Sequence, residues 1–330
     1  MTEGHNDQRV VVLGGAGYLG SVLTRQLLEQ GYQVQVFDAL RFGDDALDGV
    51  RAHPNFQLKK GDIRNIAEVT ECIPGAYAVI QLASLVGEPA CDQDPKDTVD
   101  INLIATKAVA EACRYYRVSR FIFASTDSAY GIQEGIMREQ SPMYPTSLYG
   151  KLKVRAEEEI LGLAGVGFQP TILRMATIYG LSPRMRFDLV VNVLTLNAVV
   201  NERITIFGGA QWRPLVHVAD AAAAYVLCLD ATLETVGGQV FNVGSNEQNY
   251  QIGQIGEEVR SAFPELEVET VPQSPDLRDY YVCFDKITAA LGYRVEHSVV
   301  DGVREIRRAL TDGTIANYRH PRHYNVAKGT

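Results

Sequence analysis

The stretch "VVVLGGAGYLG", residues Val10–Gly20, decides the fold of this 330-residue chain. Its first four residues form a continuous apolar run, which is typical of a parallel strand buried on both faces. Gly14, Gly17 and Gly20 then follow at the spacing G-x-x-G-x-x-G. Glycines at this spacing let the backbone turn tightly and bring a helix N-terminus close to a bound phosphate. The stretch therefore predicts the first strand, turn and helix of a nucleotide-binding α/β fold.

The same alternation of strand and helix patterns continues through the first half of the chain. Apolar runs predict further strands at "QVQVFD", "FQLKKGD", "AVIQLA", "RFIFAS" and "PTILRMATIYG". Long helices are expected over about Asp97 to Arg117 and about Ser147 to Leu163. This rhythm predicts an α/β fold with a doubly wound parallel sheet, a Rossmann fold, joined by right-handed crossovers.

The rhythm changes after Gly180, where prolines and glycines become frequent. We expect an NAD-binding Rossmann domain over residues 1–181 and a smaller α/β substrate lobe over residues 182–330. The boundary is soft, because strands such as "QVFNVG" can return to the sheet. The tail "NYRHPRHYNVAKGT" is expected to be a surface extension whose histidines are solvated and bind no metal.

Composition and charge exclude several function classes. Lys and Arg total 31 against 40 Asp and Glu, and this net charge of −9 disfavours binding to nucleic acid or to anionic membranes. The five cysteines are dispersed and form no C-x-x-C pair, so neither a metal site nor a disulfide framework is expected. The start "MTEGHNDQ" is polar, and we expect a soluble cytoplasmic protein.

An acidic residue at the end of the second predicted strand indicates which dinucleotide binds. Asp38 can accept hydrogen bonds from both ribose hydroxyls of an adenosine and would repel a 2′-phosphate, which favours NAD over NADP. Arg41, three residues later, is the residue that would favour NADP. Asp62 in "GDIR" is interpreted either as a partner for the adenine amino group or as a turn residue.

The segment "YGKLK" carries a candidate catalytic pair. Tyr149 and Lys153 are four residues apart on a predicted helix, so they share one face. A tyrosine with a pKa near ~10 is a poor base at neutral pH. A neighbouring lysine and a positive nicotinamide ring would lower that pKa. The tyrosine could then take the proton of an alcohol while a hydride leaves the same carbon.

Together these elements resemble the extended short-chain dehydrogenase/reductase family, and within it the nucleotide-sugar epimerases and dehydratases. The similarity covers nearly the whole chain and rests on "GGAGYLG", Asp38, "GDIR", "STDSAYG", "YGKLK", "LRMATIYG" and "QWRPLVHVAD". The resemblance implies an enzyme that uses NAD and forms a homodimer through its two long helices. The residues that it implies for NAD binding are Gly14, Gly17, Tyr18, Leu19, Asp38, Asp62, Ile63, Leu82, Ala83, Asn102, Tyr149 and Lys153.

The segment "STDSAYG" both matches the family and departs from it. The resemblance makes Thr126 the catalytic hydroxyl residue that hydrogen-bonds the reacting alcohol. Dehydratases of the family often carry Thr-Asp-Glu here, with the Asp as the acid and the Glu as the base that removes the C5 proton. Ser128 stands at the position of that base and cannot replace a carboxylate. Asp127 is therefore expected to bind a sugar hydroxyl or assist as an acid, or else only to cap its loop.

A nucleotide sugar carries a diphosphate, for which arginine is the natural partner. By resemblance Arg213 and Arg278 are the firmer choices, and one or two of the other arginines are expected to form ordinary ion pairs. Thr177, with the segments "LVGEPACDQDP" and "SPDLRDY", is similar to a subgroup that includes GDP-heptose 4-dehydrogenases. The expected substrate-binding residues are Thr126, Asp127, Thr177, Arg184, Arg186, Asn192, Arg213 and Arg278.

These expectations leave several functions open. The preferred one is an NAD-dependent nucleotide-sugar 4-epimerase that oxidises the C4 hydroxyl and returns the hydride. The alternatives are a 4-dehydrogenase that releases the 4-keto sugar, a 4,6-dehydratase, and a non-enzymatic dinucleotide sensor on the same fold. The sensor is disfavoured because the chain keeps Thr126, Tyr149 and Lys153.

Overall fold

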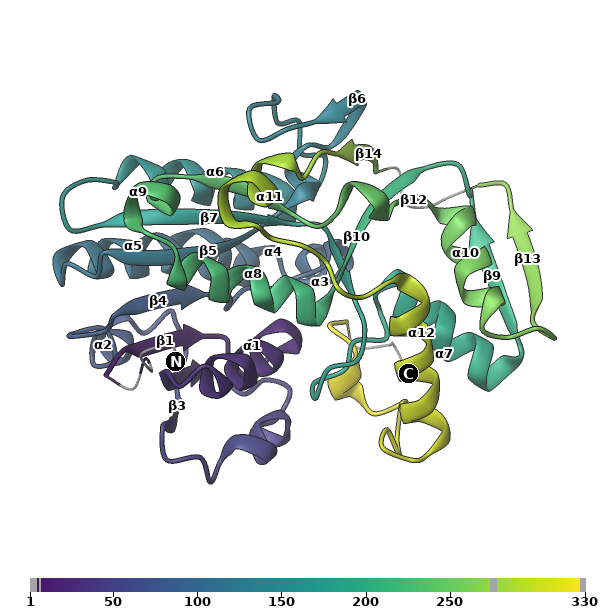
Figure 1. The fold of residues 1–330 in the computed structure, drawn as a ribbon, viewed down its shortest axis with the longest axis horizontal. Coiled ribbons are helices and arrows are strands. Elements are labelled where there is room, and N and C mark those ends of the chain that lie inside the picture. The colour runs from purple at the N-terminus through teal and green to yellow at the C-terminus, as the bar shows by residue number, and fades with distance from the viewer. Residues whose placement is uncertain (1–4, 6, 274–277, 327–330) are drawn as a thin grey trace.

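The centre of the protein is a seven-stranded parallel sheet with the strand order β11-β7-β5-β4-β1-β2-β3 (Figure 1). The computed structural model describes residues 5, 7–273 and 278–326. In register, Val10 pairs with Val34 on one side and with Ala78 on the other. The predicted doubly wound sheet is therefore confirmed. Its strands are β1 (Arg9–Leu13), β2 (Gln33–Asp38), β3 (Phe56–Lys60), β4 (Ala78–Gln81), β5 (Arg120–Thr126), β7 (Gln169–Met175) and β11 (Val240–Val243).

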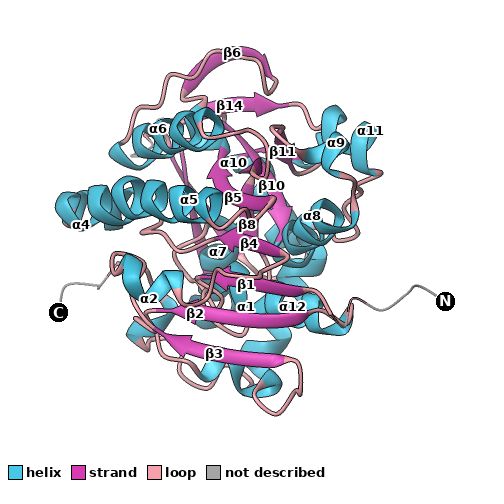
Figure 2. Ribbon diagram, turned by 90° about the vertical axis from the view of Figure 1, so that its left-hand side faces the viewer, coloured by secondary structure: helices cyan, strands magenta, loops and turns pink. Residues whose placement is uncertain are grey.

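Helices cover both faces of this sheet (Figure 2). One apolar core packs α1 and α8 against the sheet, and a second packs α2, α5 and α6 against the opposite face. The first predicted long helix is a continuous run in which a π-helical segment, Asp100–Ala105, joins α4 to α5. The helices are α1 (Tyr18–Glu29), α2 (Ile66–Thr70), α3 (Glu88–Gln93), α4 (Pro95–Val99), α5 (Thr106–Tyr115), α6 (Leu148–Gly162), α8 (Val218–Asp230), α9 (Leu233–Val236) and α11 (Asp285–Leu291).

The second lobe is built from small sheets and three helices around a core of its own. β11 lies beyond residue 181 yet pairs with β7, so the later half of the chain supplies an edge strand of the main sheet. The division at residues 181 and 182 stays a prediction. The remaining elements are β6 (Ile132–Met137), β8 (Thr177–Tyr179), β9 (Arg203–Phe207), β10 (Trp212–His217), β12 (Asn249–Gln251), β13 (Glu267–Val271), β14 (Asp279–Val282), α7 (Val190–Asn201), α10 (Ile252–Ser261) and α12 (Val299–Thr311).

Two other general expectations can be compared with the structure. All five cysteines are buried free thiols, as their dispersed positions predict. Within residues 5, 7–273 and 278–326, no helix combines the length and the apolar character that crossing a membrane requires.

The prediction of a single strand at "PTILRMATIYG" is wrong. This segment forms two strands, β7 in the main sheet and β8 in a three-stranded sheet with β10 and β12. The break lies at Ala176, whose amide still donates a hydrogen bond to the Val243 carbonyl of β11 at 3.0 Å. Beyond it the chain leaves β11 and pairs Thr177 with Leu215 of β10. The switch of partner carries the chain from one lobe to the other.

The prediction that the C-terminal tail is a surface extension is also wrong for residues 323–326, whereas residues 317 and 319–321 are exposed as predicted. His323 and Tyr324 are buried, and the His323 carbonyl accepts a hydrogen bond from the Phe187 amide at 2.9 Å. The Phe187 ring contacts both of these side chains. The tail is held because these aromatic rings remove apolar area from water. Residues 327–330 of the tail lie outside the described residues.

A buried ion pair joins helix α6 to the sheet. Arg174 of β7 and Glu157 of α6 are 3% and 1% exposed, and their charged atoms lie 2.7 Å apart. Glu157 also accepts a hydrogen bond from Ser125 of β5, and Arg174 donates to the Tyr130 hydroxyl at 3.0 Å. Glu157 lies one helical turn beyond Lys153, so this pair sets the position of the catalytic face of α6.

Replacing Glu157 with alanine leaves the Arg174 charge buried and unpaired. We expect Glu157→Ala to lower the free energy of unfolding by about 3–5 kcal/mol, because an uncompensated buried charge is strongly unfavourable. The control is Glu158→Ala on the same helix, which removes an exposed pair with Arg155 and should change stability by no more than about 0.5 kcal/mol. Urea denaturation measures the free energy of unfolding of both variants. Equal losses of stability would contradict the conclusion that the Glu157–Arg174 pair holds α6 to the sheet.

Candidate active site

The glycine turn after β1 brings three parts of the first lobe into close contact. Gly14 has a φ of 90°, and a Cβ there would lie 2.6 Å from the Ala83 amide nitrogen after β4. A Cβ on Gly20 would collide with the Gly14 carbonyl oxygen, so α1 can approach β1 only with glycine at this position. Gly17 at the N-cap offers no side chain to cover the helix start. The amides of the first turn of α1 are therefore available to an anion.

Acidic residues at the strand ends flank this turn. Asp38 accepts hydrogen bonds from the Ala16 amide at 2.9 Å and the Leu40 amide at 2.7 Å, while burial raises the pKa of its carboxyl. Arg41, the residue that would favour NADP, instead pairs with Asp97 at 3.1 Å. This arrangement supports NAD as the dinucleotide.

Asp62 belongs to an ion pair at the surface. Its carboxylate accepts hydrogen bonds from the Arg64 guanidinium, at 2.7 Å, and from the Arg64 amide, and these bonds lower the pKa of Asp62. The amide bond agrees with its interpretation as a turn residue. Because Asp62 also lines the cavity described next, the contact with adenine stays a prediction.

A cavity of about 1140 Å³ runs from the glycine turn to the second lobe. Its volume exceeds the ~300–1,000 Å³ of a site for one drug-sized ligand, so it has room for a dinucleotide and a second ligand together. All the predicted site residues line this cavity except Asn102 and Asn192. The cavity lies at the carboxyl ends of the central strands, where parallel sheets bind their ligands.

Asn102 and Asn192 lie behind the cavity wall. The Asn102 amide group bonds the Leu85 amide and carbonyl, both at 2.8 Å, and so holds the loop after β4. Asn192 accepts from the Gly180 amide at 3.0 Å and donates to the Tyr18 hydroxyl at 3.1 Å. Both side chains shape the site through the backbone segments that they hold, and their direct contacts with ligands stay predictions.

The predicted catalytic residues come together in this cavity. Thr126 is the last residue of β5, and its side chain lies beside Tyr149 on α6, where it opposes the rise in the pKa of Tyr149. Lys153 lies one turn further along α6, donates to the Ala124 carbonyl at 2.7 Å, and places its ammonium 5.8 Å from the centre of the Tyr149 ring. Cys91 of α3 lies near both, and the sequence analysis assigned it no role in the site.

Burial favours the neutral forms of the catalytic pair. It raises the pKa of Tyr149 above its usual value and lowers the pKa of Lys153 to about 8. The expected lowering of the tyrosine pKa is therefore not present in the chain alone, because removal from water outweighs every nearby charge. Further positive charge in the cavity is needed to make Tyr149 a base.

Asp127 is the second buried acid at the end of β5. It is 2% exposed, and its Oδ1 accepts a hydrogen bond from the Tyr280 hydroxyl at 3.1 Å. Its Oδ2 has no hydrogen-bond partner among the described residues. Burial raises the pKa of Asp127 to about 7, although Arg213 and Arg278 oppose this rise. An unpartnered carboxyl oxygen in a cavity wall is suited to a hydroxyl group of a ligand.

Two further residues in this part of the site, Tyr280 and Glu88, were not singled out in the sequence. Tyr280 reaches Asp127 because β14 pairs with β6, which follows "STDSAYG" in the chain. Glu88 of α3 lines the cavity and lies 3.7 Å from the Arg278 guanidinium. Both residues lie in segments that resemble the family, "LVGEPACDQDP" and "SPDLRDY", but no spacing within these segments assigns them a role, since each is brought here by a contact that is distant in sequence.

The four predicted arginines separate into two places. Arg278 donates to the Ser128 hydroxyl at 3.3 Å, and Arg213 donates to the Arg278 carbonyl at 3.1 Å, so both lie beside "STDSAYG". Arg186 forms an ion pair with Asp188 at 2.6 Å. Arg184 lies at the other end of the cavity, with its guanidinium 3.7 Å from the centre of the Phe42 ring.

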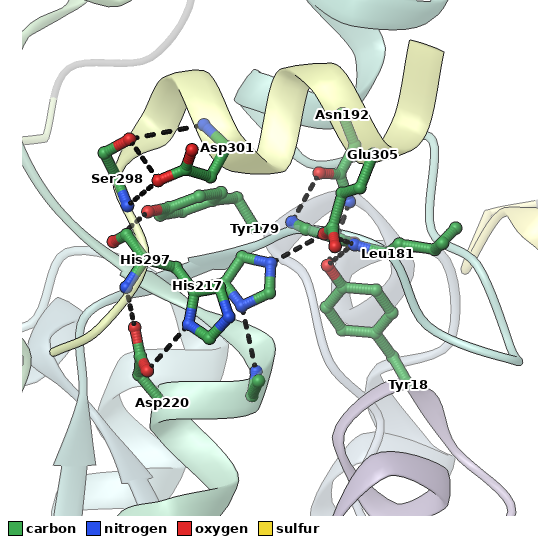
Figure 3. Close-up of polar contacts among 12 residues, drawn as sticks. Tyr18, Tyr179, Leu181, Asn192, His217, Asp220, His297, Ser298, Asp301 and Glu305 are labelled. Atoms are coloured by element: carbon green, nitrogen blue, oxygen red, sulfur yellow. Dashed lines mark hydrogen bonds and ion pairs between the residues drawn. The ribbon is translucent and has the colours of Figure 1, made fainter. Parts of the chain in front are cut away.

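A network of polar contacts ties the glycine turn to the second lobe (Figure 3). The Tyr18 hydroxyl of α1 donates to the Gly180 carbonyl at 2.6 Å. Glu305 of α12 accepts from the Leu181 amide and pairs with the His217 ring at 2.6 Å. Tyr18 therefore uses its hydroxyl to hold the two lobes together at the cofactor turn.

The same network contains three side chains of metal-ligating type. One ligand atom from each of His217, Asp220 and His297 lies within 4.8 Å of the others. The two imidazole rings are stacked, with centroids 4.3 Å apart and planes 20° from parallel. Lone pairs that lie in nearly parallel planes do not converge on one ion, and each ring already pairs with a carboxylate. We therefore infer that these three side chains have a structural role: their ion pairs join α8 to the segment before α12, and β10 to α12.

Comparison with known proteins agrees with this geometry. The sequence profile of the NAD dependent epimerase/dehydratase family matches residues 10–244. The chain belongs to this family. The resemblance to its nucleotide-sugar group is thereby confirmed, as are the predictions of an enzyme and of NAD as its cofactor.

Relatives in the family include both epimerases and dehydratases. The chain is 28% identical over 322 residues to a UDP-glucose 4-epimerase from Corynebacterium glutamicum, an alignment that covers 92% of this chain and 95% of that protein. It is also 28% identical over 313 residues to a dTDP-glucose 4,6-dehydratase from Streptomyces niveus, covering 90% of this chain and 91% of that protein.

Solved structures support the fold. A UDP-glucuronic acid 4-epimerase from Bacillus cereus, in complex with UDP-glucuronic acid and NAD, superposes with a TM-score of 0.83 at 24% identity. The superposition covers 92% of this chain and 99% of that one.

The raised pKa of Asp127 predicts how stability depends on pH. Between about pH 4 and pH 7 the folded protein holds a proton at Asp127 that the unfolded chain has lost, so stability falls as the pH rises. Asp127→Asn removes this dependence. We expect the free energy of unfolding of the variant, minus that of the wild type, to increase as the pH rises across this range, by at most about 1.4 kcal/mol per pH unit.

Urea denaturation at several pH values measures this difference. The control is Asp62→Asn, because the lowered pKa of Asp62 affects stability only below about pH 4. A difference between wild type and Asp127→Asn that stays constant from pH 4 to pH 7 would mean that Asp127 is ionised throughout.

Proposed function

We propose that the protein is an NAD-dependent nucleotide-sugar 4-epimerase in which Tyr149 is the base at the C4 hydroxyl. The observation that carries this proposal is the convergence of Thr126, Tyr149 and Lys153 at the carboxyl edge of the sheet. The cavity around them continues to the glycine turn and has room for a second ligand.

The residues of the chain divide the work at C4. The glycine turn and Asp38 suit NAD, which when bound would accept the C4 hydride and give it back. Thr126 hydrogen-bonds the reacting hydroxyl, and Tyr149 takes its proton. Lys153, held by the Ala124 carbonyl, would add its charge to that of a bound nicotinamide ring and so oppose the burial that raises the pKa of Tyr149.

A nucleoside diphosphate sugar is the substrate class that the second lobe favours. Arg213 and Arg278 lie together beside Ser128, where their charges can meet a diphosphate. The relatives named above act on UDP-glucose and dTDP-glucose, which are molecules of this class. Assays with a panel of nucleotide sugars would identify the nucleotide base and the sugar that this protein prefers.

Ser128 favours epimerisation over loss of water. A 4,6-dehydratase needs a base that removes the C5 proton. The neutral hydroxyl of Ser128, which stands at the position of that base, cannot remove this proton as a carboxylate would. A 4,6-dehydratase is nevertheless the second candidate, because Glu88 places another carboxylate in the cavity wall beside Arg278. A 4-dehydrogenase would use the same catalytic residues and differ only in releasing the ketone.

The proposal includes a homodimer. Helices α5 and α6 lie side by side on one face of the sheet, as Figure 2 shows. The run that contains α5 exposes apolar side chains, with Ile104 58% and Tyr115 80% exposed. Such side chains are suited to an isologous contact between the same helices of two copies.

The role of Tyr149 can be tested by removing one oxygen atom. We expect Tyr149→Phe to lower turnover about 10²-fold or more, because the base is lost, while NAD still binds. The control is Tyr144→Phe, since Tyr144 is 62% exposed and lies outside the cavity. Turnover is measured with a nucleotide sugar that the wild type converts, and NAD binding by equilibrium dialysis. Activity of Tyr149→Phe within a few-fold of wild type would remove Tyr149 from the mechanism.

The mass of the product separates the three outcomes at C4. We expect incubation with UDP-, dTDP- and GDP-sugars to yield a sugar of unchanged mass and inverted C4, because the hydride returns and no base is placed for elimination. Mass spectrometry and proton NMR of the product measure this. A loss of two hydrogens would identify a 4-dehydrogenase, and a loss of water would identify a dehydratase and make Glu88→Gln the next variant.

A further inference from the structure

The end of the chain crosses the dinucleotide end of the cavity. Residues 317–326 pack against the segment after β8, where the Phe187 ring contacts His323 and Tyr324. Asn325 and Val326 reach the cavity and line it. This segment, here called the strap, is therefore part of the wall of the site.

The strap is also bonded to the first lobe at two loops. The Asn325 amide donates to the Val86 carbonyl, in the loop after β4, at 2.8 Å. Arg322 forms an ion pair with Asp45, in the segment after β2. These two loops follow the strands that flank β1, so the strap bridges the edges of the dinucleotide site.

Arg184 connects the strap to the cofactor end of the cavity. It is 5% exposed, and its guanidinium donates a hydrogen bond to the side-chain oxygen Oδ1 of Asn325 at 2.7 Å. Its guanidinium lies over the Phe42 ring, and its charge partly opposes the rise that burial causes in the pKa of Asp38. The sequence placed Arg184 with the sugar nucleotide, whereas these contacts place it beside the residue that suits the adenosine ribose.

Within residues 5, 7–273 and 278–326 the Arg184 guanidinium forms no ion pair, although the charges of Asp188 and Asp38 act on it. Its Nε has no hydrogen-bond partner among the described residues, although the side chain is buried in the cavity wall. A buried guanidinium with a free donor is unfavourable unless an anion completes it. A dinucleotide bound at the glycine turn would bring such an anion to this end of the cavity in its phosphates.

We propose that Arg184, positioned by Asn325, binds the NAD phosphates, and that the strap thereby slows release of the dinucleotide. Retention would serve an enzyme that must return the hydride it has removed, and this consequence alone rests on the proposed 4-epimerase. The strap itself concerns only NAD and the residues that hold it.

The test is the release rate of the reduced dinucleotide from the full-length protein. The protein is loaded with NADH, an excess of NAD⁺ is added, and the loss of bound NADH fluorescence is followed in time. We expect Asn325→Ala to release NADH about tenfold faster, because two hydrogen bonds are lost, and Arg184→Gln to do the same. Arg319→Ala is the matched control, since Arg319 is exposed on the same segment.

A charge swap provides a second measurement that does not alter the cavity wall. Asp45→Arg and Arg322→Asp should each speed release, and the double variant should restore the wild-type rate. Folding of every variant is checked by thermal unfolding. Wild-type release rates in folded Asn325→Ala, Arg184→Gln and both single swap variants would overturn the proposal. Because no sugar is present, failure of the 4-epimerase proposal would leave this result unaffected.

Discussion

The close approach of α1 to β1 at the glycine turn is the constraint on which the rest of the structure depends. Glycine at position 20 lets the helix start directly beneath the turn, and this brings the N-terminus of α1 to the carboxyl edge of the sheet. The same approach delivers Tyr18 to Gly180 and so attaches the second lobe to the cofactor turn. A larger side chain here would displace both the phosphate site and the contact between the lobes.

The site contains ionisable side chains whose charged forms the surrounding protein does not fully stabilise. Burial shifts the pKa of Asp127 and of Lys153 toward the neutral form, and raises the pKa of Tyr149. Each of these groups lines the cavity in which, under the proposed function, a charged cofactor and a charged substrate bind. The ligands therefore act on the protonation states as well as on geometry, because they bring charge into a region from which water is largely removed.

The arginines show how one residue type serves two ends of the same cavity. Arg213 and Arg278 are held beside "STDSAYG" by backbone and hydroxyl contacts, which suits them to the sugar nucleotide. Arg184 is held near Asp38 by Phe42 and Asn325, which suits it to the dinucleotide. The C-terminal segment decides this separation, since it supplies Asn325.

The sequence by itself determined the features that depend on neighbours along the chain. The glycine spacing, Asp38 at a strand end and the four-residue separation of Tyr149 and Lys153 follow from local periodicity, and all of them lie within residues 10–244, which the family profile matches. Only the tertiary structure decided the break at Ala176, the pairing of β14 with β6, and the place of Arg184. These features depend on contacts between residues far apart in the chain, such as Asn325 with Val86, whose free energy comes from burial and hydrogen bonding that no local pattern encodes.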